Sequence, residues 1–480
     1  MNDRTVSKRQ ERNVDVAVIG VGTAGQSAAR EVAKVTDRFV VIDDKMRGTT
    51  CAFAGCMPSK VLIQVADDYH RRHVLKRQGI KGAEKLEVEE NGAKVMAYVR
   101  KLRDGFVAGD RKGMKRLGKH LIAGTACFLE PQLLEVDGQH IRAKKVVVAT
   151  GSSPVVPGPW KEFSPYLLTT ESLFEMKALP RRLAVIGLGP VGLELGQALA
   201  RLGVEVFGFE MGKTVGGASD PVVSDAMCEQ LRKEMELHLN TPAKLLNHKD
   251  GVAVEANGEK TSVDAVLVTV GRRHNLDNLG LNPIGVEIDE QGRPEIDPAT
   301  CRIPGHPIYV AGDATGRRAI LHEASDEGRI AGYNAVRQED HSFVRRTPLN
   351  VVFCSPNIVA VGERYDSLDP SLSVIGEMDF SRQSRAKIME ANFGVCRIYA
   401  TKKEGRLLGA EMAVTDGEHL GHLLAWSIYQ QMTVYDLLQN VHYHPTLEEG
   451  LRRAIRDAAK KTELERPSQE LALCDSCACV

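Results

Sequence analysis

Two stretches of this chain repeat one order of apolar, small and polar positions. They begin near residues 14 and 183, and each consists of an apolar run, a glycine-rich segment and a stretch with helical spacing of apolar residues. The pattern predicts a buried strand, a tight turn and a helix in each copy. A second apolar run follows each copy and ends in an acid, Asp43 or Glu210. The turn glycines are Gly20, Gly22 and Gly25 in the first copy, and Gly187, Gly189 and Gly192 in the second.

The spacing of these glycines is typical of a dinucleotide-binding site. The first glycine permits the turn, the second lets a pyrophosphate approach the backbone, and the third lets the helix pack against the strand. Free N–H groups at the start of the helix hold the phosphates, and the acid accepts hydrogen bonds from ribose hydroxyls. A single turn of this kind could serve packing alone. Two copies, each with its strand, helix and acid, predict two Rossmann-like domains and an α/β fold.

Three further strand-like runs end in glycine-containing segments. The segments are Thr150 and Gly151 after residues 145–149, Gly271 after residues 265–270, and Gly312 and Asp313 after residues 308–311. Prolines between residues 154 and 159 mark a crossing between domains. After about residue 346, short alternating segments precede amphipathic helices, which we expect over residues 417–431, 434–440 and 447–461. This change of pattern predicts a separate α+β domain.

Composition narrows the class of protein. The chain has 480 residues, 43% of them hydrophobic and 26% charged, which suits two to four domains with large cores. Lys plus Arg and Asp plus Glu both total 63, so charge gives no reason to expect nucleic acid or an anionic membrane as partner. The charged N-terminus does not resemble a secretory signal, and no apolar run reaches the roughly 20 residues that span a bilayer. We therefore expect a soluble, cytoplasmic protein.

Two of the ten cysteines, Cys51 and Cys56, stand in a segment rich in small residues. Their spacing allows a disulfide across about one helical turn. Pro58 suits the first turn of a helix, which would place Cys56 at a helix N-terminus, where a thiolate is stabilised. The spacing alone is equally compatible with two buried thiols. Five more cysteines fall on strand-like or helix-like segments, and we interpret them as packing residues: Cys127, Cys228, Cys301, Cys354 and Cys396.

The segment from Gly48 to Lys60 resembles the redox signature of the flavin disulfide reductases. This group, the FAD-dependent pyridine nucleotide-disulfide oxidoreductase family, includes dihydrolipoamide dehydrogenase, glutathione reductase and mercuric reductase. The resemblance covers roughly residues 13–462 and includes the segments at 149–151, 270–273, 311–313, 384–387 and 442–446. It implies a dinucleotide-binding FAD domain split in sequence, an NAD domain and a C-terminal α+β dimerisation domain. The predicted boundaries are 1–155, 156–274, 275–345 and 346–465, followed by a flexible cysteine-containing tail at 466–480.

The resemblance also implies roles for individual residues. Cys51 would be the thiol that exchanges with the substrate, and Cys56 the thiol that communicates with the flavin. Lys60 resembles the family lysine near the flavin ring, and Glu194 its partner carboxylate; either charge alone could also be an ordinary helix-surface residue. Asp313 resembles the acid that binds the ribitol hydroxyls, and the helix beginning near residue 321 would point its N-terminus at the flavin.

His444 and Glu449 resemble the family's general-base pair. The imidazole would accept a proton from a substrate thiol, while Glu449 would fix its tautomer and orientation. Glu448 is the alternative partner, and register favours Glu449. In this family the pair reaches the active site from the other subunit, which implies a homodimer.

Glu210 and His444 favour one branch of the family. A carboxylate after the second nucleotide strand accepts ribose hydroxyls and repels a 2′-phosphate, which favours NAD over NADP despite the nearby Lys213. Mercuric reductase generally has tyrosine where this chain has His444. We therefore expect a dihydrolipoamide dehydrogenase-type enzyme that uses FAD and NAD and acts on lipoamide or another small disulfide, either free or carried by a lipoyl domain.

Several departures leave the substrate open. The segment before Cys51 reads Gly-Thr-Thr instead of Gly-Gly-Thr or Gly-Gly-Val, and Pro190 replaces an aromatic residue that gates the nicotinamide site in many relatives. The tail thiols Cys474, Cys477 and Cys479 are foreign to ordinary lipoamide dehydrogenases. The first alternative is therefore an NAD(P)H-dependent disulfide or mercuric reductase that uses these thiols. A non-catalytic flavoprotein is a second alternative, against which the redox cysteines and His444 argue.

Overall fold

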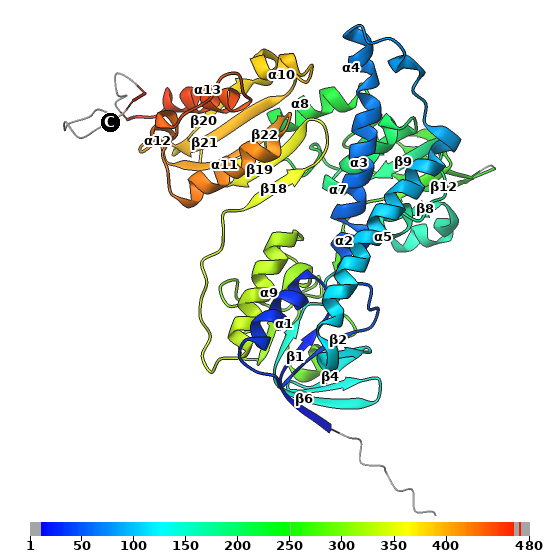
Figure 1. The fold of residues 1–480 in the computed structure, drawn as a ribbon, viewed down its shortest axis with the longest axis vertical. Helices are drawn as coiled ribbons and strands as arrows, with labels where there is room; N and C mark the ends of the chain where they lie inside the picture. Colours follow the sequence, from blue (N-terminus) through cyan, green and yellow to red (C-terminus); the bar gives the residue numbers. More distant parts are fainter. Residues whose placement is uncertain (1–10, 250, 465–469, 472–480) are drawn as a thin grey trace, which may run out of the picture. The chain divides into compact units, whose positions relative to one another are not determined.

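The computed structural model describes residues 11–249, 251–464, 470 and 471 (Figure 1). The chain forms two compact units. One comprises Met1–Pro58, Tyr98–Val155 and Gly271–Arg345, and the other Ser59–Ala97, Val156–Val270 and Arg346–Val480. The assignment of these stretches to FAD, NAD and dimerisation domains stays a prediction.

The first unit is built on a seven-stranded sheet. Strands β1 (Glu11–Ile19), β2 (Phe39–Asp43) and β3 (Leu121–Ala123) are parallel, and β1 also pairs in parallel with β6 (Gln139–Val148). The C-terminal part of β6 also pairs in parallel with β17 (Ile308–Val310), and its N-terminal part pairs antiparallel with β5 (Leu133–Val136). β5 in turn pairs with β4 (Ala126–Glu130). The C-terminal halves of the central strands, residues 16–19 of β1 and 146–148 of β6, are apolar and buried, as expected where both faces of a parallel sheet are covered.

Helices α1 (Thr23–Ala33) and α9 (Leu321–Ala335) pack closely against each other in this unit (Figure 1). Glycines on α9 allow the approach. A Cβ at Gly328 would lie 2.2 Å from the carbonyl oxygen of Ala24, and one at Gly332 would lie 2.5 Å from that of Ala28. The first unit also contains the short helix α2 (Thr50–Ala54). The boundary between the units falls within two helices, after Pro58 in α3 (Cys56–His70) and after Ala97 in α5 (Ala93–Lys115).

The second unit contains a parallel nucleotide-type sheet and a small antiparallel sheet. The parallel sheet has the order β11-β10-β9-β15-β8. Its strands are β8 (Leu167–Leu168), β9 (Arg182–Ile186), β10 (Glu205–Phe209), β11 (Glu236–His238) and β15 (Ala265–Val268). Helices α7 (Pro190–Arg201) and α8 (Pro221–Leu231) accompany them. The antiparallel sheet joins β12 (Lys244–His248), β13 (Gly251–Ala256) and β14 (Glu259–Val263).

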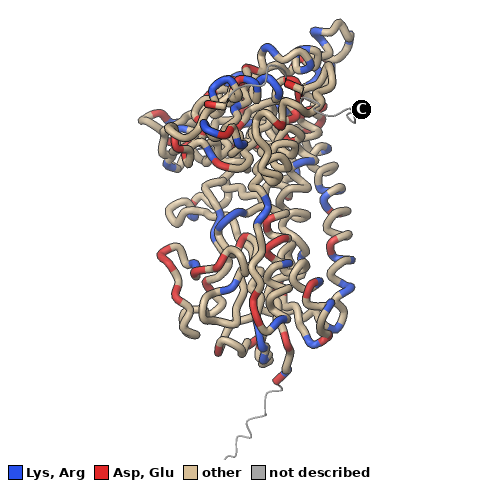
Figure 2. The backbone as a smooth tube through the Cα atoms, turned by 90° about the vertical axis from the view of Figure 1, so that its left-hand side faces the viewer, with Lys and Arg blue, Asp and Glu red and all other residues tan. Residues whose placement is uncertain are grey.

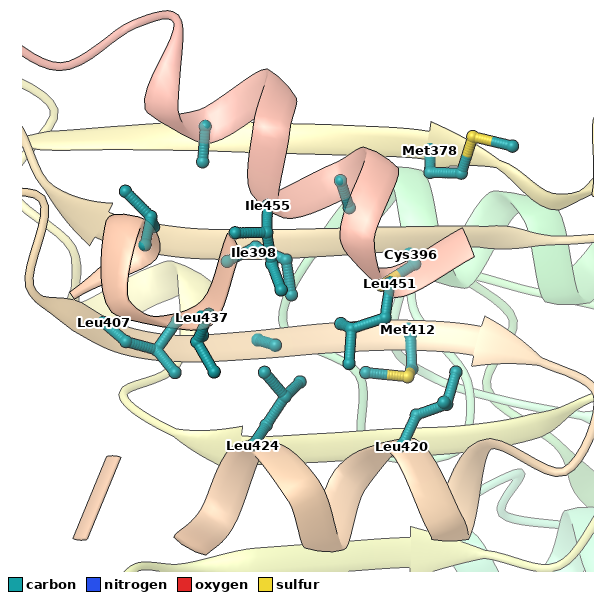
Figure 3. Packing of buried hydrophobic residues seen from close by; sticks show 14 of the residues in the cluster. Met378, Cys396, Ile398, Leu407, Met412, Leu420, Leu424, Leu437, Leu451 and Ile455 are labelled. Carbon is teal, nitrogen blue, oxygen red and sulfur yellow. The ribbon is translucent and has the colours of Figure 1, made fainter. Parts of the chain in front are cut away.

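The C-terminal part of the second unit is a five-stranded antiparallel sheet. Its order is β18-β19-β22-β21-β20, with β18 (Leu349–Val352), β19 (Asn357–Gly362), β20 (Ser373–Asp379), β21 (Val395–Thr401) and β22 (Leu407–Val414). Helices α11 (Gly417–Tyr429), α12 (Val434–Gln439) and α13 (Glu448–Ala459) bury apolar residues against it. Figure 3 shows Leu420 and Leu424 of α11 and Leu451 and Ile455 of α13 reaching toward the strands.

The α/β class and the C-terminal α+β part are confirmed. The predicted helices at 417–431, 434–440 and 447–461 appear as α11, α12 and α13, with ends that differ by one or two residues. Basic and acidic residues are interspersed along the chain (Figure 2), in keeping with their equal totals of 63. None of the helices in the described part of the chain has the length and hydrophobicity needed to span a bilayer.

Candidate active site

The first glycine turn has the backbone that a nucleotide site requires. Gly20 has a φ of 100°, and a Cβ there would lie 2.3 Å from the carbonyl oxygen of Ala149. A Cβ at Gly25 would lie 1.9 Å from the carbonyl oxygen of Gly20, so α1 starts directly against the turn. The Asp43 carboxylate accepts the N–H of Val21 at 3.0 Å through one oxygen and the N–H of Met46 at 2.6 Å through the other.

The second turn reproduces this geometry. Gly187 has a φ of 95°, and a Cβ at Gly192 would lie 2.0 Å from its carbonyl oxygen. The Glu210 carboxylate accepts the N–H of Leu188 at 2.7 Å and that of Gly212 at 2.9 Å. Each acid therefore ties the end of its second strand to the residue after the first glycine of the turn.

Both turns fit a bound pyrophosphate. A Cβ at Gly22 or Gly189 would have no atom of the described residues within 4 Å, so the space over each turn is open. These two residues are also the N-caps of α1 and α7, and among the described residues no side chain caps either helix start. The first-turn N–H groups are thus available to phosphate oxygens. Near the first turn, the buried hydroxyl of Thr150 has no hydrogen-bond partner in the described part of the chain, as expected of a group that meets a ligand.

Asp313 lies in a polar group at the end of β17. Its Oδ2 accepts a hydrogen bond from the Ser152 hydroxyl at 2.7 Å, and Arg272 donates to the same hydroxyl at 2.8 Å. The neighbouring Gly312 has a φ of 74° and donates its N–H to the buried carboxylate of Glu327 at 2.8 Å. Burial raises the pKa of Glu327, while Arg345 acts in the opposite direction. Sequence reasoning missed Ser152 and Glu327, which hold the predicted ribitol-binding segment in shape.

The two redox cysteines lie on consecutive helices. Cys51 is in α2, and Cys56 is the first residue of α3, with Pro58 in the first turn as predicted. The segment is not one continuous helical turn, because Gly55 breaks it with φ −120° and ψ −124°. A Cβ at Gly55 would lie 3.1 Å from the Cα of Cys51, so the break brings the two helices close together. Both cysteines are thiols here, and the pKa of Cys51 is raised first by a hydrogen bond with Cys56 and then by burial.

Lys60 lies one turn after Cys56 on α3 and pairs with Glu194 of α7. Its Nζ is 2.7 Å from Glu194 Oε2 and 4.5 Å from the ring centroid of Phe353. The other oxygen of Glu194 accepts the N–H of Phe353 at 2.9 Å. The Glu194 side chain is 9% exposed, so this carboxylate is nearly buried and fully engaged. The interpretation of these charges as independent surface residues is thereby excluded, and Phe353 joins the pair as a partner that the sequence did not indicate.

His444 and Glu449 form a hydrogen-bonded pair before and within α13. The Nδ1 atom of His444 is 2.9 Å and 3.1 Å from the two oxygens of Glu449. The bond from His444 lowers the pKa of Glu449. Because an ionised carboxylate only accepts, Nδ1 donates and the lone pair of Nε2 is left to receive a proton. Glu449 rather than Glu448 is the partner, and the side chain of His444 is 73% exposed.

The packing of α13 fixes this pair. Leu451 and Ile455 are buried under the helix (Figure 3), and a Cβ at Gly450 would lie 2.7 Å from the ring of Phe380. Gln383, which is 2% exposed, donates from its amide to the carbonyl oxygen of Thr446 at 2.6 Å. Gln383 therefore holds the loop that carries His444, a role that no sequence signal indicated.

The remaining cysteines divide into two groups. Cys228, Cys301, Cys354 and Cys396 are buried and Cys127 is half-buried, as expected of packing residues. Burial raises the pKa of Cys301, Cys354 and Cys396 to about 12, so these thiols are poor nucleophiles. The predicted tail thiols Cys474, Cys477 and Cys479 lie outside the described residues.

Comparison with known proteins places the chain among enzymes with this arrangement. Residues 14–328 match the family described as pyridine nucleotide-disulphide oxidoreductase, and residues 349–455 match its dimerisation domain. The chain is 32% identical over 452 residues to dihydrolipoyl dehydrogenase of Bacillus subtilis (strain 168), which covers 91% of this chain and 94% of that protein. It is 27% identical over 471 residues to mercuric reductase of Staphylococcus aureus, which covers 94% of this chain and 84% of that protein.

Solved structures give the same picture of the fold. LpdA from Mycobacterium tuberculosis superposes with a TM-score of 0.79 at 26% identity, over 92% of this chain and 99% of that one. The HOCl-induced flavoprotein disulfide reductase RclA from Escherichia coli, in its Cu(II) complex, superposes with a TM-score of 0.80 at 22% identity, again over 92% and 99%. At that identity the likeness to RclA concerns the fold alone.

Proposed function

The chain belongs to the pyridine nucleotide-disulphide oxidoreductase family, whose members are FAD-dependent enzymes that use NAD(P)H, and on that premise we propose that it acts as a dihydrolipoyl dehydrogenase. The substrate would be a dithiol such as dihydrolipoamide, free or on a lipoyl domain, and the electron acceptor would be NAD⁺. The family's dimerisation domain spans residues 349–455 and supports a homodimer. Large apolar side chains exposed on α11, Trp426 and Tyr429, are available to such an interface.

The observation that carries the proposal is the pairing of His444 with Glu449 at 2.9 Å. Exchange between a dithiol and a disulfide requires the attacking thiol to lose its proton, because the thiolate is the nucleophile. A histidine whose Nδ1 is held by a carboxylate presents the lone pair of Nε2 as a base. A protein that only bound FAD would have no need of an exposed imidazole oriented in this way.

The exchange would proceed in two steps on the oxidised Cys51–Cys56 pair. One substrate thiol gives its proton to His444, and its sulfur attacks Cys51, which breaks the Cys51–Cys56 bond and releases Cys56 as a thiolate. The second substrate thiol then loses its proton and its sulfur attacks the first, which breaks the mixed disulfide and leaves the substrate as a disulfide. Cys51 takes up that second proton and is released as a thiol, while the first proton stays on His444. The substrate loses two electrons and the cysteine pair gains them. The start of α3 stabilises the Cys56 thiolate.

FAD, when bound, supplies the two-electron carrier between the dithiol and the nicotinamide. The residues that would hold it are the first glycine turn, Asp43, Thr150, Gly151, Gly312 and Asp313, with Lys60 and Glu194 near the ring as the family resemblance implies. The second turn, Glu210 and Gly271 would hold NAD. The Glu210 carboxylate favours NAD, because its charge repels the 2′-phosphate of NADP.

Substitution of the base pair tests the proposal. His444→Gln should lower lipoamide turnover by about 100-fold, the range expected when a general base is lost. Glu449→Gln should have a smaller effect, since the imidazole remains but is oriented less well. Glu448→Gln is the matched control, because it makes the same change at the neighbouring residue while Glu449 remains the partner of His444. This variant should retain full turnover.

The half-reaction with NADH provides the second measurement. Rapid reduction by NADH should survive in His444→Gln, because that step involves no substrate thiol. Near-normal lipoamide turnover in His444→Gln, or equal losses in the Glu448 and Glu449 variants, would contradict the proposal.

A second candidate function is reduction of a larger disulfide or of Hg(II) through the tail thiols. Glu470 supports it, because its carboxylate pairs with Arg456 at 2.5 Å and Arg452 at 2.6 Å on α13, the helix that begins at Glu448. These two arginines, Arg456 first, lower the pKa of Glu470 to about 2. Glu470 therefore lies beside α13, and it precedes Cys474 by four positions in the sequence.

Truncation after Leu473 separates the two functions, because it removes the tail thiols and leaves Glu470 in place. Under the second candidate, lipoamide turnover stays constant while reduction of a larger disulfide or of Hg(II) is lost. If the truncated enzyme matches the full chain on every acceptor, the second candidate is wrong.

A further inference from the structure

The residue two positions before Cys51 is Thr49, where the resemblance in sequence would place glycine, and the structure shows two contacts that its side chain makes. Its backbone is extended, with φ −78° and ψ 143°, so the position does not need the freedom of glycine. Thr49 is the N-cap of α2, and its hydroxyl oxygen accepts the N–H of Ala52 at 3.2 Å. Glycine could not make this bond. The substitution therefore adds a side-chain cap to the helix that carries Cys51.

Asp110 of α5 holds the same threonine. Its Oδ2 accepts the backbone N–H of Thr49 at 2.9 Å and also the Thr49 hydroxyl. The preceding Gly48 has a φ of 93°, and a Cβ there would lie 3.3 Å from the same carboxylate oxygen, so the loop passes directly over Asp110. The Thr49 hydroxyl thus donates to Asp110 while accepting from Ala52. A continuous set of hydrogen bonds joins the long helix α5 to the short helix α2.

The short helix needs this support. α2 has five residues, too few for a helix to be stable by itself, and it ends at the break formed by Gly55. Its orientation therefore depends on its cap and on the contacts of its ends. Cys51 is the second residue of α2, one position after Thr50. Any movement of the cap would move the sulfur that the substrate must reach.

We propose that Thr49 and Asp110 are positioning residues for Cys51, which hold its thiol in the orientation required for exchange with the substrate. This inference rests on the proposed role of Cys51 in the reaction. The charge of Asp110 acts in addition to its hydrogen bonds. After the bond with Cys56 and burial, the carboxylate also raises the pKa of Cys51. The hydrogen bonds of the pair orient the helix that carries the thiol, and the negative charge of Asp110 acts in the direction of a higher pKa for Cys51.

Four variants separate these effects. Thr49→Val removes the hydroxyl and keeps the shape of the side chain, and Thr49→Ser restores the hydroxyl. Thr50→Val is the matched control, the same change one residue later on an exposed side chain. Asp110→Asn removes the charge and keeps an oxygen that can accept from Thr49. FAD content and thermal stability are measured first, so that each comparison is made between folded holoenzymes.

Two readouts are measured on these holoenzymes. The first is the rate at which iodoacetamide alkylates Cys51 in the NADH-reduced enzyme, with the site identified by peptide mass. The second is kcat/KM for lipoamide. Thr49→Val should lower kcat/KM about fivefold, the equivalent of one lost helix cap, while Thr49→Ser and Thr50→Val stay near wild type. Asp110→Asn should accelerate alkylation of Cys51 by about two- to tenfold, because a nearby negative charge has been removed.

The outcomes that overturn the inference are specific. If Thr49→Val behaves like Thr50→Val in both readouts, or if serine fails to restore what valine removes, the hydroxyl does not position Cys51. An alkylation rate unchanged by Asp110→Asn removes the role of the carboxylate. Because alkylation does not depend on which disulfide is the substrate, it reports on Cys51 even if the wild-type enzyme ignores lipoamide. A wild-type enzyme that does not turn over lipoamide would refute the proposed function. The positioning inference would then be decided by the alkylation rates.

Discussion

The two nucleotide turns of this protein have the same backbone, but the helices that follow them bury different chemistry. When α1 and α7 are aligned on Gly25 and Gly192, Ser27 corresponds to Glu194. Ser27 meets the hydroxyl of Ser325 on α9 at 3.1 Å and accepts a hydrogen bond from Arg30 of its own helix at 3.0 Å. Glu194 instead pairs with Lys60 of α3, the helix that begins at Cys56.

The same alignment pairs Lys34 with Arg201 at the ends of the two helices. Lys34 is 66% exposed and pairs with its helix neighbour Glu31. Arg201 is 6% exposed and bridges Asp67 of α3 and Glu234, with Nε 2.6 Å from the latter. The backbone of the turn is therefore shared by the two copies, whereas the outer face of the helix differs according to the element against which it packs. In α1 that neighbour is a second helix at close range, and in α7 it is the helix that begins with Cys56.

The largest expected effects come from filling the two open turns separately. Gly22→Ala and Gly189→Ala each add a methyl group that meets no atom of the described residues, so the fold should persist. The methyl would occupy space needed by a pyrophosphate, which should weaken binding by about 10- to 100-fold. Gly22→Ala should be isolated with little FAD. Gly189→Ala should remain yellow and lose reduction by NADH.

Absorbance of the purified proteins and stopped-flow reduction by NADH measure these effects. Gly105→Ala on α5, which also adds a methyl to open space, is the control and should change neither. Loss of FAD from Gly189→Ala instead would show that the second turn binds FAD and that the proposed assignment of the two turns is wrong.

The second effect tests the helix ends. Arg201→Met leaves Asp67 and Glu234 close together without their cation and should cost about 3 kcal/mol of stability, as expected for a broken buried pair. Lys34→Met, at the corresponding position of α1, should cost less than about 0.5 kcal/mol, because exposed pairs contribute little. Urea unfolding followed by tryptophan and flavin fluorescence measures both. Equal losses in the two variants would mean that the buried charges of α7 contribute no more than the surface pair of α1.

The sequence predicted the residues of the two glycine turns better than the residues that pack the following helices against the rest of the protein. Glycine turns and terminal acids recur at a fixed spacing, so Asp43 and Glu210 could be predicted along the chain. The structure shows each carboxylate accepting an N–H of its turn, while their contact with a nucleotide stays a prediction. Asp67 and Asp110 could not, because their partners are distant in sequence. Arg201 lies 134 positions from Asp67, and Asp110 lies 61 positions from Thr49. Only folding brings such residues together, and no local sequence pattern indicates which charged residues will form ion pairs.

The third effect concerns the choice of nicotinamide nucleotide. Glu210→Gln removes the negative charge but keeps an oxygen that can accept from Leu188 or Gly212. The ratio of kcat/KM for NADH to that for NADPH should therefore fall by about tenfold while the turn keeps its shape. Asp43→Asn, the corresponding change in the first turn, should leave that ratio unchanged. A ratio that does not respond to Glu210→Gln would show that this carboxylate does not select the nucleotide.

The last effect is a pH dependence of stability that arises where α3 meets α7. Burial, and then the positive charge of Arg201, lower the pKa of His70 to about 4. An unfolded histidine titrates near 6.5, so between these values the folded protein binds fewer protons than the unfolded chain. The contribution of neutral His70 is therefore fully present above about pH 6.5 and is lost as the pH falls toward 4.

Thermal midpoints measured across this pH range test the role of α7 in that dependence. The midpoint of the wild type should decrease toward pH 4 more than that of His70→Gln, because only the wild type must keep a buried imidazole neutral. His419→Gln, a change at a side chain that is 73% exposed, is the control and should follow the wild type. Arg201→Met should also reduce the dependence, because removing the cation makes protonation of His70 easier in the folded state. If the thermal midpoints of the wild type and His70→Gln change with pH in parallel, burial of His70 does not contribute to the pH dependence of stability.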